Sequence, residues 1–507
     1  MELMKKYKPL LFYTTLFLLI LAFSTTAQYF DFDLWARLIA GMGVIDGGHV
    51  LKADFLSYTP VHTWWDHEWG AGVIFYLCLK LFGPYSLIIL QAVLLFGIFF
   101  ILSKIIKLRT NICPYNFLFY FFALMALLQN LNNPVRCHLF SFLFFALFIY
   151  ILEKVRKGNN KIIYLIPVIT IFWNNIHGGV VSGIGLILMY AIGEYLNKKP
   201  FKQYFNILII SIFCMLLNPW GYNYIKFLLV ANTMKRPDIM EWWGIFSKFH
   251  KFKQIPFKIF MFFTVIIEVI KNYKIIKNES VQKWYKNADK VKVIVLLSTL
   301  YLSIIHVKLI PLFVISAVAF TYEDFYALIK NVKFPPYKDK LVYGLILFMS
   351  FFALTAKQLS LPLDFETYPV KEVEFIKENN IKGNILVNFG LGSYVSYKLY
   401  PQNLIFMDGR YEEVYYDFMV PLLKKFYLVN QGWDEVLVKY PPDCMIIEKY
   451  YPVYNKLKNS NNWVLVYESK VFGVFVPYTK LRKSYILPSN DIKYYKNTLF
   501  DTGIKFK

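Results

Sequence analysis

The chain contains few cysteines and few acidic side chains for its length. Its cysteines are scattered without a CxxC pair, at Cys78, Cys113, Cys137, Cys214 and Cys444, and this spacing argues against a zinc site or a disulfide framework. Asp and Glu number 33 against 56 Lys and Arg. No basic stripe or binding motif accompanies this excess, so we expect no nucleic-acid partner. Internal repeats and low-complexity tracts are also lacking, which excludes a repeat architecture.

Long hydrophobic runs, in contrast, are abundant. Of the 507 residues, 57% are hydrophobic, and 49 are Phe and 39 are Tyr. A soluble globule has no use for so many apolar runs, so the composition predicts a polytopic α-helical membrane protein. We expect membrane-spanning helices at 9–28, 84–105, 114–131, 134–152, 161–177, 178–196, 203–218, 256–271, 291–306, 308–322 and 341–358. The short stretch 69–82 either crosses the membrane or, as we favour, lies on its surface as an interfacial helix.

The charges of the connecting loops predict the topology. If 69–82 lies on the surface, most lysine-rich loops fall on the cytoplasmic side, whereas a crossing reverses this bias. The sequence therefore predicts about eleven spans in the cell membrane and a cytoplasmic N-terminus. One predicted outer loop, 218–255, breaks the rule because it carries Lys235, Arg236, Lys248, Lys251 and Lys253.

The character of the sequence changes near Pro362. Short β-type runs at 384–388, 403–407, 444–448, 463–468 and 471–477 alternate with helical stretches at 370–379, 413–428, 433–440 and 451–459. This alternation is typical of a small α/β domain. We therefore expect a membrane domain over 1–361 and an extracytoplasmic α/β domain over 362–507.

The first predicted outer loop, 29–68, gathers acidic and imidazole side chains. They are Asp31, Asp33, Asp46, Asp54, Asp66 and Glu68, with His49, His62 and His67, and only Arg37 and Lys52 oppose them. A carboxylate at the membrane surface can take a proton from an attacking hydroxyl or hold a divalent cation such as Mg²⁺ or Mn²⁺. The structural alternative is that Asp31 and Asp33 cap the helix that contains Trp35.

Further polar clusters lie at other predicted outer loops. Arg136 either grips a phosphate with paired hydrogen bonds or extends to lipid head groups. His177 follows Asn175 at a hairpin with two glycines, where it either contacts a sugar or phosphate or stabilises the turn. Glu241 precedes two indoles, which bind sugar faces or anchor the chain in the membrane. Lys308 either neutralises a lipid phosphate or is an ordinary surface charge.

Two motifs of the C-terminal region receive structural interpretations. Asn388 to Tyr394 contains a GxG but lacks the full dinucleotide pattern, so we expect no nucleotide site there. Asp408-Gly409-Arg410 follows a predicted strand, where loops often bind ligands. We favour a structural Asp–Arg turn for it.

These residues together resemble the GT-C-type membrane glycosyltransferases of bacteria, in the broad group with the protein O-mannosyltransferases and lipid A sugar transferases. The resemblance rests on Asp31-x-Asp33-x-Trp35, Asp54-Phe55-Leu56-Ser57-Tyr58-Thr59 and Trp65-Asp66-His67-Glu68-Trp69, and later on 175–179, 218–221 and 408–410. Where related sequences show a second Trp and a His, this chain has Ala36 and Arg37.

The resemblance implies an enzyme that takes a sugar from a polyprenyl-phosphate carrier on the outer face of the membrane. The base or metal ligand is then Asp31 or Asp33, of which we favour Asp33, and Glu68 matches the acidic position at the end of the loop. His67 is expected to shape the same site. The remaining site residues are expected to contact the substrate: Arg136, His177 and Lys308 at the phosphate, and Trp35, Asn175 and Glu241 at unspecified positions.

The sequence thus predicts a glycosyltransferase whose partners are the lipid donor, membrane lipid and an extracytoplasmic glycan, lipid or protein acceptor. A transporter or flippase for a lipid-linked sugar is one alternative. It predicts ionisable residues deep inside the spans and two related halves, whereas here the charges collect at span ends. The other alternative is an inactive scaffold of the same fold.

Overall fold

The computed structural model describes residues 2–26, 29–128, 135–237, 239–330, 338–356 and 361–506. The chain divides into two compact units. The helical unit comprises Met1–Ala27 and Ile88–Ser360, and the mixed unit comprises Gln28–Leu87 and Leu361–Lys507. One division between these units falls between residues 360 and 361. However, residues 28–87, which the sequence assigned to the membrane domain, fold together with the C-terminal residues.

The structure contains a helix at the position of each of the eleven predicted spans. These helices are α1 (Glu2–Ser24), α4 (Tyr85–Thr110), α5 (Phe117–Leu128), α6 (His138–Arg156), α7 (Leu165–Ile176), α8 (Val180–Leu196), α9 (Lys202–Cys214), α11 (Ile255–Asn278), α13 (Lys290–Ile305), α14 (Ile310–Ile329) and α15 (Lys338–Ala356). The predicted span ends at 27–28, 129–134 and 357–358 lie outside the described residues.

Three helical segments of the described chain are long and apolar enough to cross a membrane: Tyr85–Thr110, His138–Arg156 and Val307–Ile329. The other predicted spans correspond to shorter or less apolar helices. A helix is the form that an apolar run takes in lipid, because it satisfies its own backbone hydrogen bonds. The structure is therefore compatible with membrane association, while the number of eleven spans stays a prediction.

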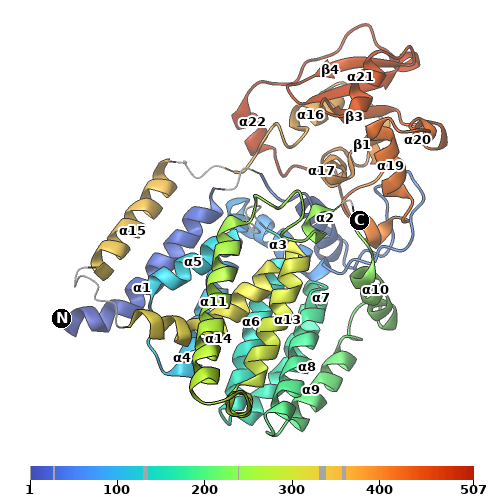
Figure 1. Cartoon of the computed structure of the whole chain (residues 1–507). Helices are drawn as coiled ribbons and strands as arrows, with labels where there is room; N and C mark the ends of the chain where they lie inside the picture. Colours follow the sequence, from blue (N-terminus) through green and yellow to red (C-terminus); the bar gives the residue numbers. More distant parts are fainter. Residues whose placement is uncertain are drawn as a thin grey trace. The chain divides into compact units, whose positions relative to one another are not determined.

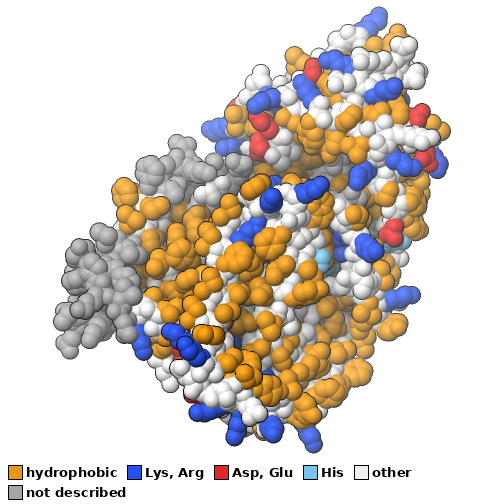
Figure 2. Space-filling view, viewed as in Figure 1, with side chains coloured by type: hydrophobic (Ala, Val, Ile, Leu, Met, Phe, Trp, Pro, Cys, Tyr) orange, Lys and Arg blue, Asp and Glu red, His pale blue; other side chains and the backbone are white. Residues whose placement is uncertain are grey.

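The helices of the helical unit pack side by side. α13 contacts both α8 and α14, and α14 contacts α6 and α11 (Figure 1). The outward face of α11 is apolar, because Ile259, Phe262, Ile266 and Val269 are each more than half exposed. In Figure 2, hydrophobic side chains cover much of the visible face of this unit, and Lys and Arg side chains stand at its lower edge. An exposed apolar helix face of this kind suits contact with lipid.

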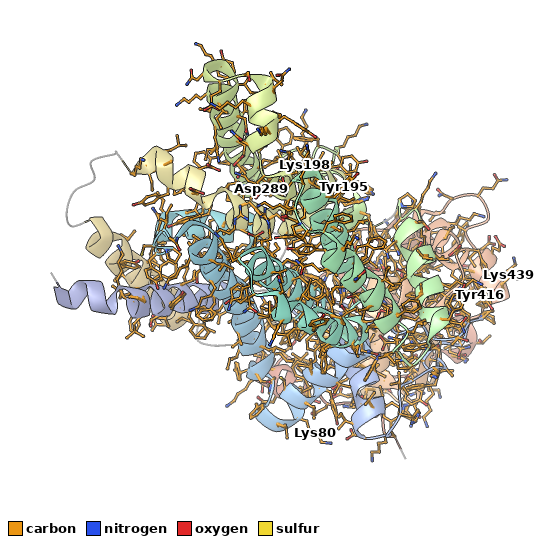
Figure 3. All side chains as sticks on the ribbon, turned by 90° about the horizontal axis from the view of Figure 1, so that it is seen from below. Lys80, Tyr195, Lys198, Asp289, Tyr416 and Lys439 are labelled. Atoms are coloured by element: carbon orange, nitrogen blue, oxygen red, sulfur yellow. The ribbon has the colours of Figure 1, made fainter. Side chains whose placement is uncertain are left out.

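Partly buried ion pairs join four helices at one end of this unit. Arg156 at the end of α6 contacts Glu194 of α8 at 2.6 Å, and it contacts Asp289, which precedes α13, at 2.9 Å. Figure 3 labels Asp289 at this end. Glu153 accepts hydrogen bonds from Arg156 at 3.0 Å and from Arg109 of α4 at 2.6 Å. Arg109 and Arg156, at the ends of α4 and α6, are therefore bound to carboxylates within the protein.

The mixed unit contains a five-stranded sheet among its described residues. The strands are β1 (Gly383–Val387), β2 (Asn403–Ile405), β3 (Cys444–Glu448), β4 (Trp463–Glu468) and β5 (Phe472–Pro477), in the order β2-β1-β3-β5-β4. β1 is parallel to β2 and β3, whereas β5 is antiparallel to β3 and β4. The strands of the predicted α/β domain are thus confirmed.

The mixed unit also contains nine α-helices among its described residues. They are α2 (Leu34–Ile45), α3 (Trp69–Phe82), α16 (Val370–Glu378), α17 (Phe389–Leu399), α18 (Tyr411–Val414), α19 (Met419–Leu428), α20 (Glu435–Lys439), α21 (Pro452–Lys458) and α22 (Ile492–Asn497). α17 contains the GxG motif. A Cβ on Gly392 would lie 2.3 Å from the carbonyl oxygen of Met407, so this glycine permits close packing of α17 rather than phosphate binding.

The acidic loop 29–68 joins the C-terminal region through its backbone. The backbone N–H of Tyr58 donates to the carbonyl of Ile405 at 3.1 Å, and the N–H of Ile405 donates to Leu56 at 2.9 Å. These bonds cover the outer edge of β2, which a sheet otherwise leaves unpaired. Strand pairing is therefore the physical reason why the loop belongs to the mixed unit.

The ambiguous stretch 69–82 forms α3, and α3 packs on α2. Two glycines allow a close approach of their backbones. A Cβ on Gly41 would lie 2.2 Å from the carbonyl oxygen of Gly72, and one on Gly72 would lie 2.3 Å from that of Arg37. A larger side chain at either position would force the two helices apart.

Candidate functional site

Asp31 and Asp33 lie at the start of α2, where the sequence placed them. The backbone N–H of Asp33 donates to Oδ1 of the buried Asp31 at 3.1 Å. Asp33 occupies the N-cap position, but its own carboxylate makes no capping hydrogen bond to α2. Asp31 therefore organises the turn, whereas capping does not account for the half-buried carboxylate of Asp33.

The carboxylate of Asp33 faces the segment that follows β2. A Cβ on Gly409 would lie 3.0 Å from Asp33 Oδ1. Arg37 follows Asp33 by four residues in α2, so the two side chains lie on one face of the helix. Arg37 contacts Glu413, four residues beyond Gly409. The start of α2 and the segment 409–413 thus form one polar site, which we call the carboxylate site.

Arg37 is the centre of the carboxylate site. It is buried, it donates to Asp66, and its Nη2 donates to Glu413 Oε2 at 2.8 Å. Its Nε lies 3.4 Å from Glu68 Oε2. The indole of Trp64 also donates to Glu413, at 3.1 Å. Glu413 was not singled out from the sequence, because no local pattern connects it to residues nearly four hundred positions earlier.

The surroundings of His67 favour a positive charge on its imidazole. Its Nδ1 lies 2.8 Å from Glu413 Oε1, and its Nε2 lies 3.5 Å from Glu68 Oε1. Burial opposes the charge, but the carboxylates of Glu413 and Glu68 outweigh it and raise the pKa of the imidazole to about 9. Burial also raises the pKa of Asp66 to about 6, against the attraction of Arg37. A histidine that is protonated at neutral pH is an electrostatic partner and not a general base.

The carboxylate site suits a divalent cation poorly. His67, Glu68 and Glu413 each offer a ligand atom, and these atoms lie within 4.8 Å of one another. However, Arg37 and His67 already supply two positive charges to the carboxylates of Asp66, Glu68 and Glu413. Glu413 also uses Oε2 to accept from Arg37 and Trp64. A metal would have to displace these partners, so we derive no step through one.

Asp408-Gly409-Arg410 forms the structural turn that the sequence favoured. Arg410 is fully buried, and its Nε donates to Asp408 Oδ1 at 2.9 Å. Its Nη1 donates to Asp54 Oδ1 at 2.6 Å, and the guanidinium lies 4.4 Å from the ring of Trp64. Burial opposes a charge on Asp54, but Arg410 outweighs it and lowers the pKa of this carboxyl. The Asp54 motif of the loop and the Arg410 motif of the C-terminal region are therefore partners.

Trp35 packs in the core instead of facing a ligand. Its side chain is 1% exposed, and its indole N–H donates to the hydroxyl of Tyr368 at 3.1 Å. Tyr394 and Tyr397 lie against the same ring. This placement argues against the predicted substrate contact of Trp35 and assigns it to the stability of the mixed unit.

A second group of predicted residues meets in the helical unit, and we call it the cation cluster. Arg136 forms a two-pronged ion pair with Glu241, with Nη2 3.2 Å from Oε2. The ammonium of Lys308 and the guanidinium of Arg236 lie 4.6 and 4.5 Å from the ring of Trp242. Burial would raise the pKa of Glu241, but Arg136 and Lys308 hold it below its usual range. Arg136 and Lys308 therefore act on the carboxylate of Glu241, and Arg236 lies against the neighbouring indole of Trp242.

His177 stabilises the hairpin between α7 and α8, and Asn175 joins the end of α7 to residues 217 and 218. The N–H of Gly179 donates to Nδ1 of His177 at 2.9 Å, and the hydroxyl of Ser141 lies 2.6 Å from the same nitrogen. Nδ1 is therefore the acceptor, and Nε2 carries the proton. Asn175 accepts from the amide of Asn218 at 3.2 Å. These contacts fit the turn-stabilising interpretation and supply no direct evidence of a substrate.

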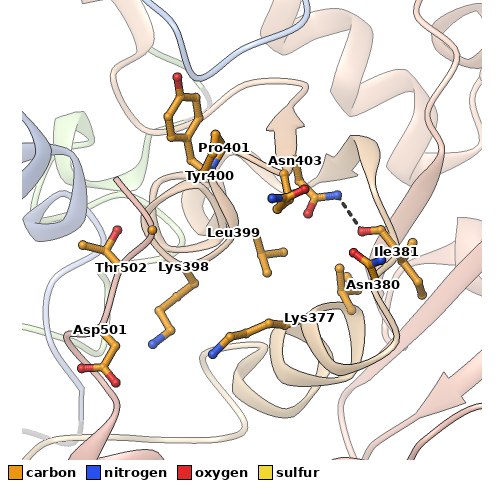
Figure 4. A pocket seen from close by; sticks show the side chains of 13 residues that line it. Lys377, Asn380, Ile381, Lys398, Leu399, Tyr400, Pro401, Asn403, Asp501 and Thr502 are labelled. Atoms are coloured by element: carbon orange, nitrogen blue, oxygen red, sulfur yellow. Dashed lines mark hydrogen bonds between the residues drawn. The ribbon is translucent and has the colours of Figure 1, made fainter. Parts of the chain in front are cut away.

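A cavity of about 300 Å³ in the mixed unit lies apart from the residues that the sequence singled out. Lys377, Lys398 and Asp501 are among the residues that line it (Figure 4). Lys398 Nζ donates to the carbonyl of Thr498 at 2.6 Å, and burial lowers the pKa of Lys398 to about 8. This lysine therefore supports the chain around α22, and we assign no ligand to the cavity.

The structure thus separates the predicted site residues by unit. Asp31, Asp33, His67 and Glu68 lie in the mixed unit, and Arg136, Glu241, Lys308, His177 and Asn175 lie in the helical unit. Comparison with known proteins adds no name to either group: no protein-family model matches the chain, and no protein with a curated description matches it.

Proposed function

We propose that the chain is a membrane glycosyltransferase of the GT-C type, which moves a sugar from a polyprenyl-phosphate donor to an extracytoplasmic acceptor. In the proposed reaction, the acceptor hydroxyl attacks the anomeric carbon and the bond from that carbon to the phosphate oxygen breaks. Asp33 takes the proton of the hydroxyl, and the polyprenyl phosphate leaves with the bonding electrons.

The observation that carries this proposal is the cation cluster. Among the described residues, Arg136 pairs with Glu241, and Arg236 and Lys308 both lie against the ring of the neighbouring Trp242. The planar fork of an arginine matches two oxygens of a phosphate. Arg136 lies next to the start of α6 and Lys308 next to the start of α14, two helices apolar enough to contact a lipid chain. A ligand with a phosphate head and a long apolar tail satisfies both features.

The carboxylate site supports the other half of the reaction. Asp33 is half-buried beside buried charged groups, a surrounding in which a carboxylate can serve as a base. Charge that develops on the leaving phosphate is the main electrostatic demand of the reaction, and the cation cluster suits it. Asp33 as the base and the cluster as the phosphate site are the two assignments that experiments must test.

The first test is consumption of the donor by purified protein in lipid nanodiscs. We expect loss of at least one donor from a panel of polyprenyl-phosphate sugars. Lys308→Met is expected to raise the KM for that donor by about tenfold, because a charge-assisted contact to the phosphate is lost. Lys80→Met, which removes a lysine paired with Asp46 in the mixed unit, is the matched control. In sealed proteoliposomes, intact donor that crosses the bilayer without losing its sugar would instead support a flippase.

The second test addresses topology. We propose that the protein is a multi-pass cell-membrane protein with about eleven spans, a cytoplasmic N-terminus and an extracytoplasmic C-terminal domain. Cys113 is exposed and lies in a predicted cytoplasmic loop. A membrane-impermeant maleimide is expected to label Cys113 in inverted vesicles and Lys439→Cys, at an exposed position of the mixed unit, in right-side-out vesicles. Labelling of both positions from one side would contradict the proposed sidedness.

A further inference from the structure

The sheet of the mixed unit has a topological switch point between β1 and β3. The two strands are parallel neighbours, and β2 pairs with the other edge of β1. The chain therefore continues from β1 to β2 on one side of β1 and then crosses to β3 on its other side. In α/β sheets, such a point opens a crevice at the carboxyl ends of the strands, where ligands bind. Asn388 directly follows β1, and Glu448 ends β3.

Polar and aromatic side chains converge at this switch point. Asn388 Nδ2 donates to Glu448 Oε1 at 2.9 Å and lies 3.3 Å from the hydroxyl of Tyr451. The ring centroids of Tyr450 and Tyr427 each lie 4.6 Å from that of Tyr451. The side-chain oxygen of Asn388 accepts a hydrogen bond from the backbone N–H of Gly390 at the start of α17. We call these five residues, Asn388, Tyr427, Glu448, Tyr450 and Tyr451, the switch-point cluster.

Two buried polar atoms of the switch-point cluster lack a partner among the described residues. Glu448 is 3% exposed and Tyr427 is 4% exposed. Within that part of the chain, neither Glu448 Oε2 nor the Tyr427 hydroxyl makes a hydrogen bond. Buried polar groups are normally paired, so an unpaired oxygen at the carboxyl end of β3 marks a place where a further partner can bind. Burial also raises the pKa of Glu448 to about 7, and near neutral pH this group can therefore either donate to or accept from a hydroxyl.

The chemistry of the cluster indicates which ligand it suits. Tyr450 is 69% exposed, so its ring offers an apolar face next to the carboxyl group of Glu448 and the amide of Asn388. Neighbouring Lys449 pairs with Glu468 at 2.8 Å, and the members of the cluster contribute no cation. Phosphates and nucleotides are therefore disfavoured. A neutral sugar presents hydroxyls to the carboxyl and amide groups and C–H faces to the rings.

We propose that the switch-point cluster is a binding site for a neutral saccharide. Glu448 and Asn388 bind its hydroxyls, and Tyr450 packs against its ring. In the proposed transferase this saccharide is part of the acceptor, an assignment that rests on the proposed function. Saccharide binding itself does not depend on it, because it requires neither Asp33 nor a lipid donor.

The experiment is saturation-transfer NMR on the full chain in lipid nanodiscs, since maltoside detergents carry a sugar head group. The probes are the methyl glycosides of mannose, glucose and galactose. We expect at least one to receive magnetisation from the protein. Tyr450→Ala is expected to weaken its binding by up to about tenfold, because the exposed stacking face is lost. Tyr478→Ala is the matched control, because Tyr478 is 64% exposed in the same unit and outside the cluster.

The outcomes separate this inference from the proposed function. Glu448→Gln keeps the shape of the buried group and is expected to weaken binding and reduce its pH dependence near 7. Binding that survives both Tyr450→Ala and Glu448→Gln, or no binding of any probe, overturns the inference. Glycoside binding without consumption of any lipid donor leaves the saccharide site in place and counts against the transferase. Donor consumption without glycoside binding supports the transferase and counts against the saccharide site.

Discussion

Replacing Asp33 with Asn is expected to lower donor turnover by about 10²–10⁴-fold, the usual contribution of a general base. The amide has nearly the same shape as the carboxylate but cannot take the proton of the attacking hydroxyl. Asp33 makes no capping hydrogen bond to α2, so the variant is expected to fold. The effect should appear in kcat with little change in KM, because the cation cluster that is proposed to hold the donor is untouched. Single-turnover measurements on the best donor of the panel provide this comparison.

Two further variants delimit the assignment of Asp33. Asp31→Asn is expected to have a smaller effect, because an amide oxygen can still accept the backbone bond from Asp33. Asp46→Asn removes an acidic residue of the same loop that pairs with Lys80, and it should leave turnover unchanged. Full product formation by both Asp33→Asn and Asp31→Asn would show that neither residue is the base.

Arg410→Met is expected to destabilise the mixed unit by about 3–5 kcal/mol, the usual cost of removing one partner from a buried ion pair. The substitution leaves two carboxylates without their cation in the core, because the guanidinium contacts Asp54 at 2.6 Å and Asp408 at 2.9 Å with no exposed surface. The loop and the C-terminal region meet at this residue. The change should therefore lower the unfolding midpoint by on the order of 10 °C and open the loop to proteases.

The control for this experiment makes the same chemical change in an exposed pair. Lys439 contacts Glu435 within α20 at 2.6 Å, but the pair lies at the surface. Water screens such a pair, so Lys439→Met is expected to leave the midpoint almost unchanged. Thermal unfolding followed by limited proteolysis compares the two variants. Equal midpoints for both would mean that the buried ion pair does not hold the loop to the sheet.

Local patterns in the sequence located most of the regular elements. Helices stand at all the predicted spans, since an apolar run satisfies its backbone only by internal hydrogen bonds. Alternation of short β-type and helical runs located the strands of the sheet. The helix α17, which begins at the GxG motif, was not predicted; its Gly392 packs closely against the carbonyl oxygen of Met407. The eleven spans and their orientation remain predictions. The charges of the loops set the orientation relative to a membrane, and the fold by itself contains no information on that orientation.

The sequence by itself determined most of the helical segments, the strands and where acidic residues concentrate, because these properties depend mainly on neighbours in the chain. Only the tertiary structure decided which of these residues meet. It paired the loop with β2, buried Trp35, and placed Glu413 between Arg37 and His67. It also brought Arg136 to Glu241. Such contacts depend on packing between segments far apart in the chain, for which periodicity and spacing carry no signal.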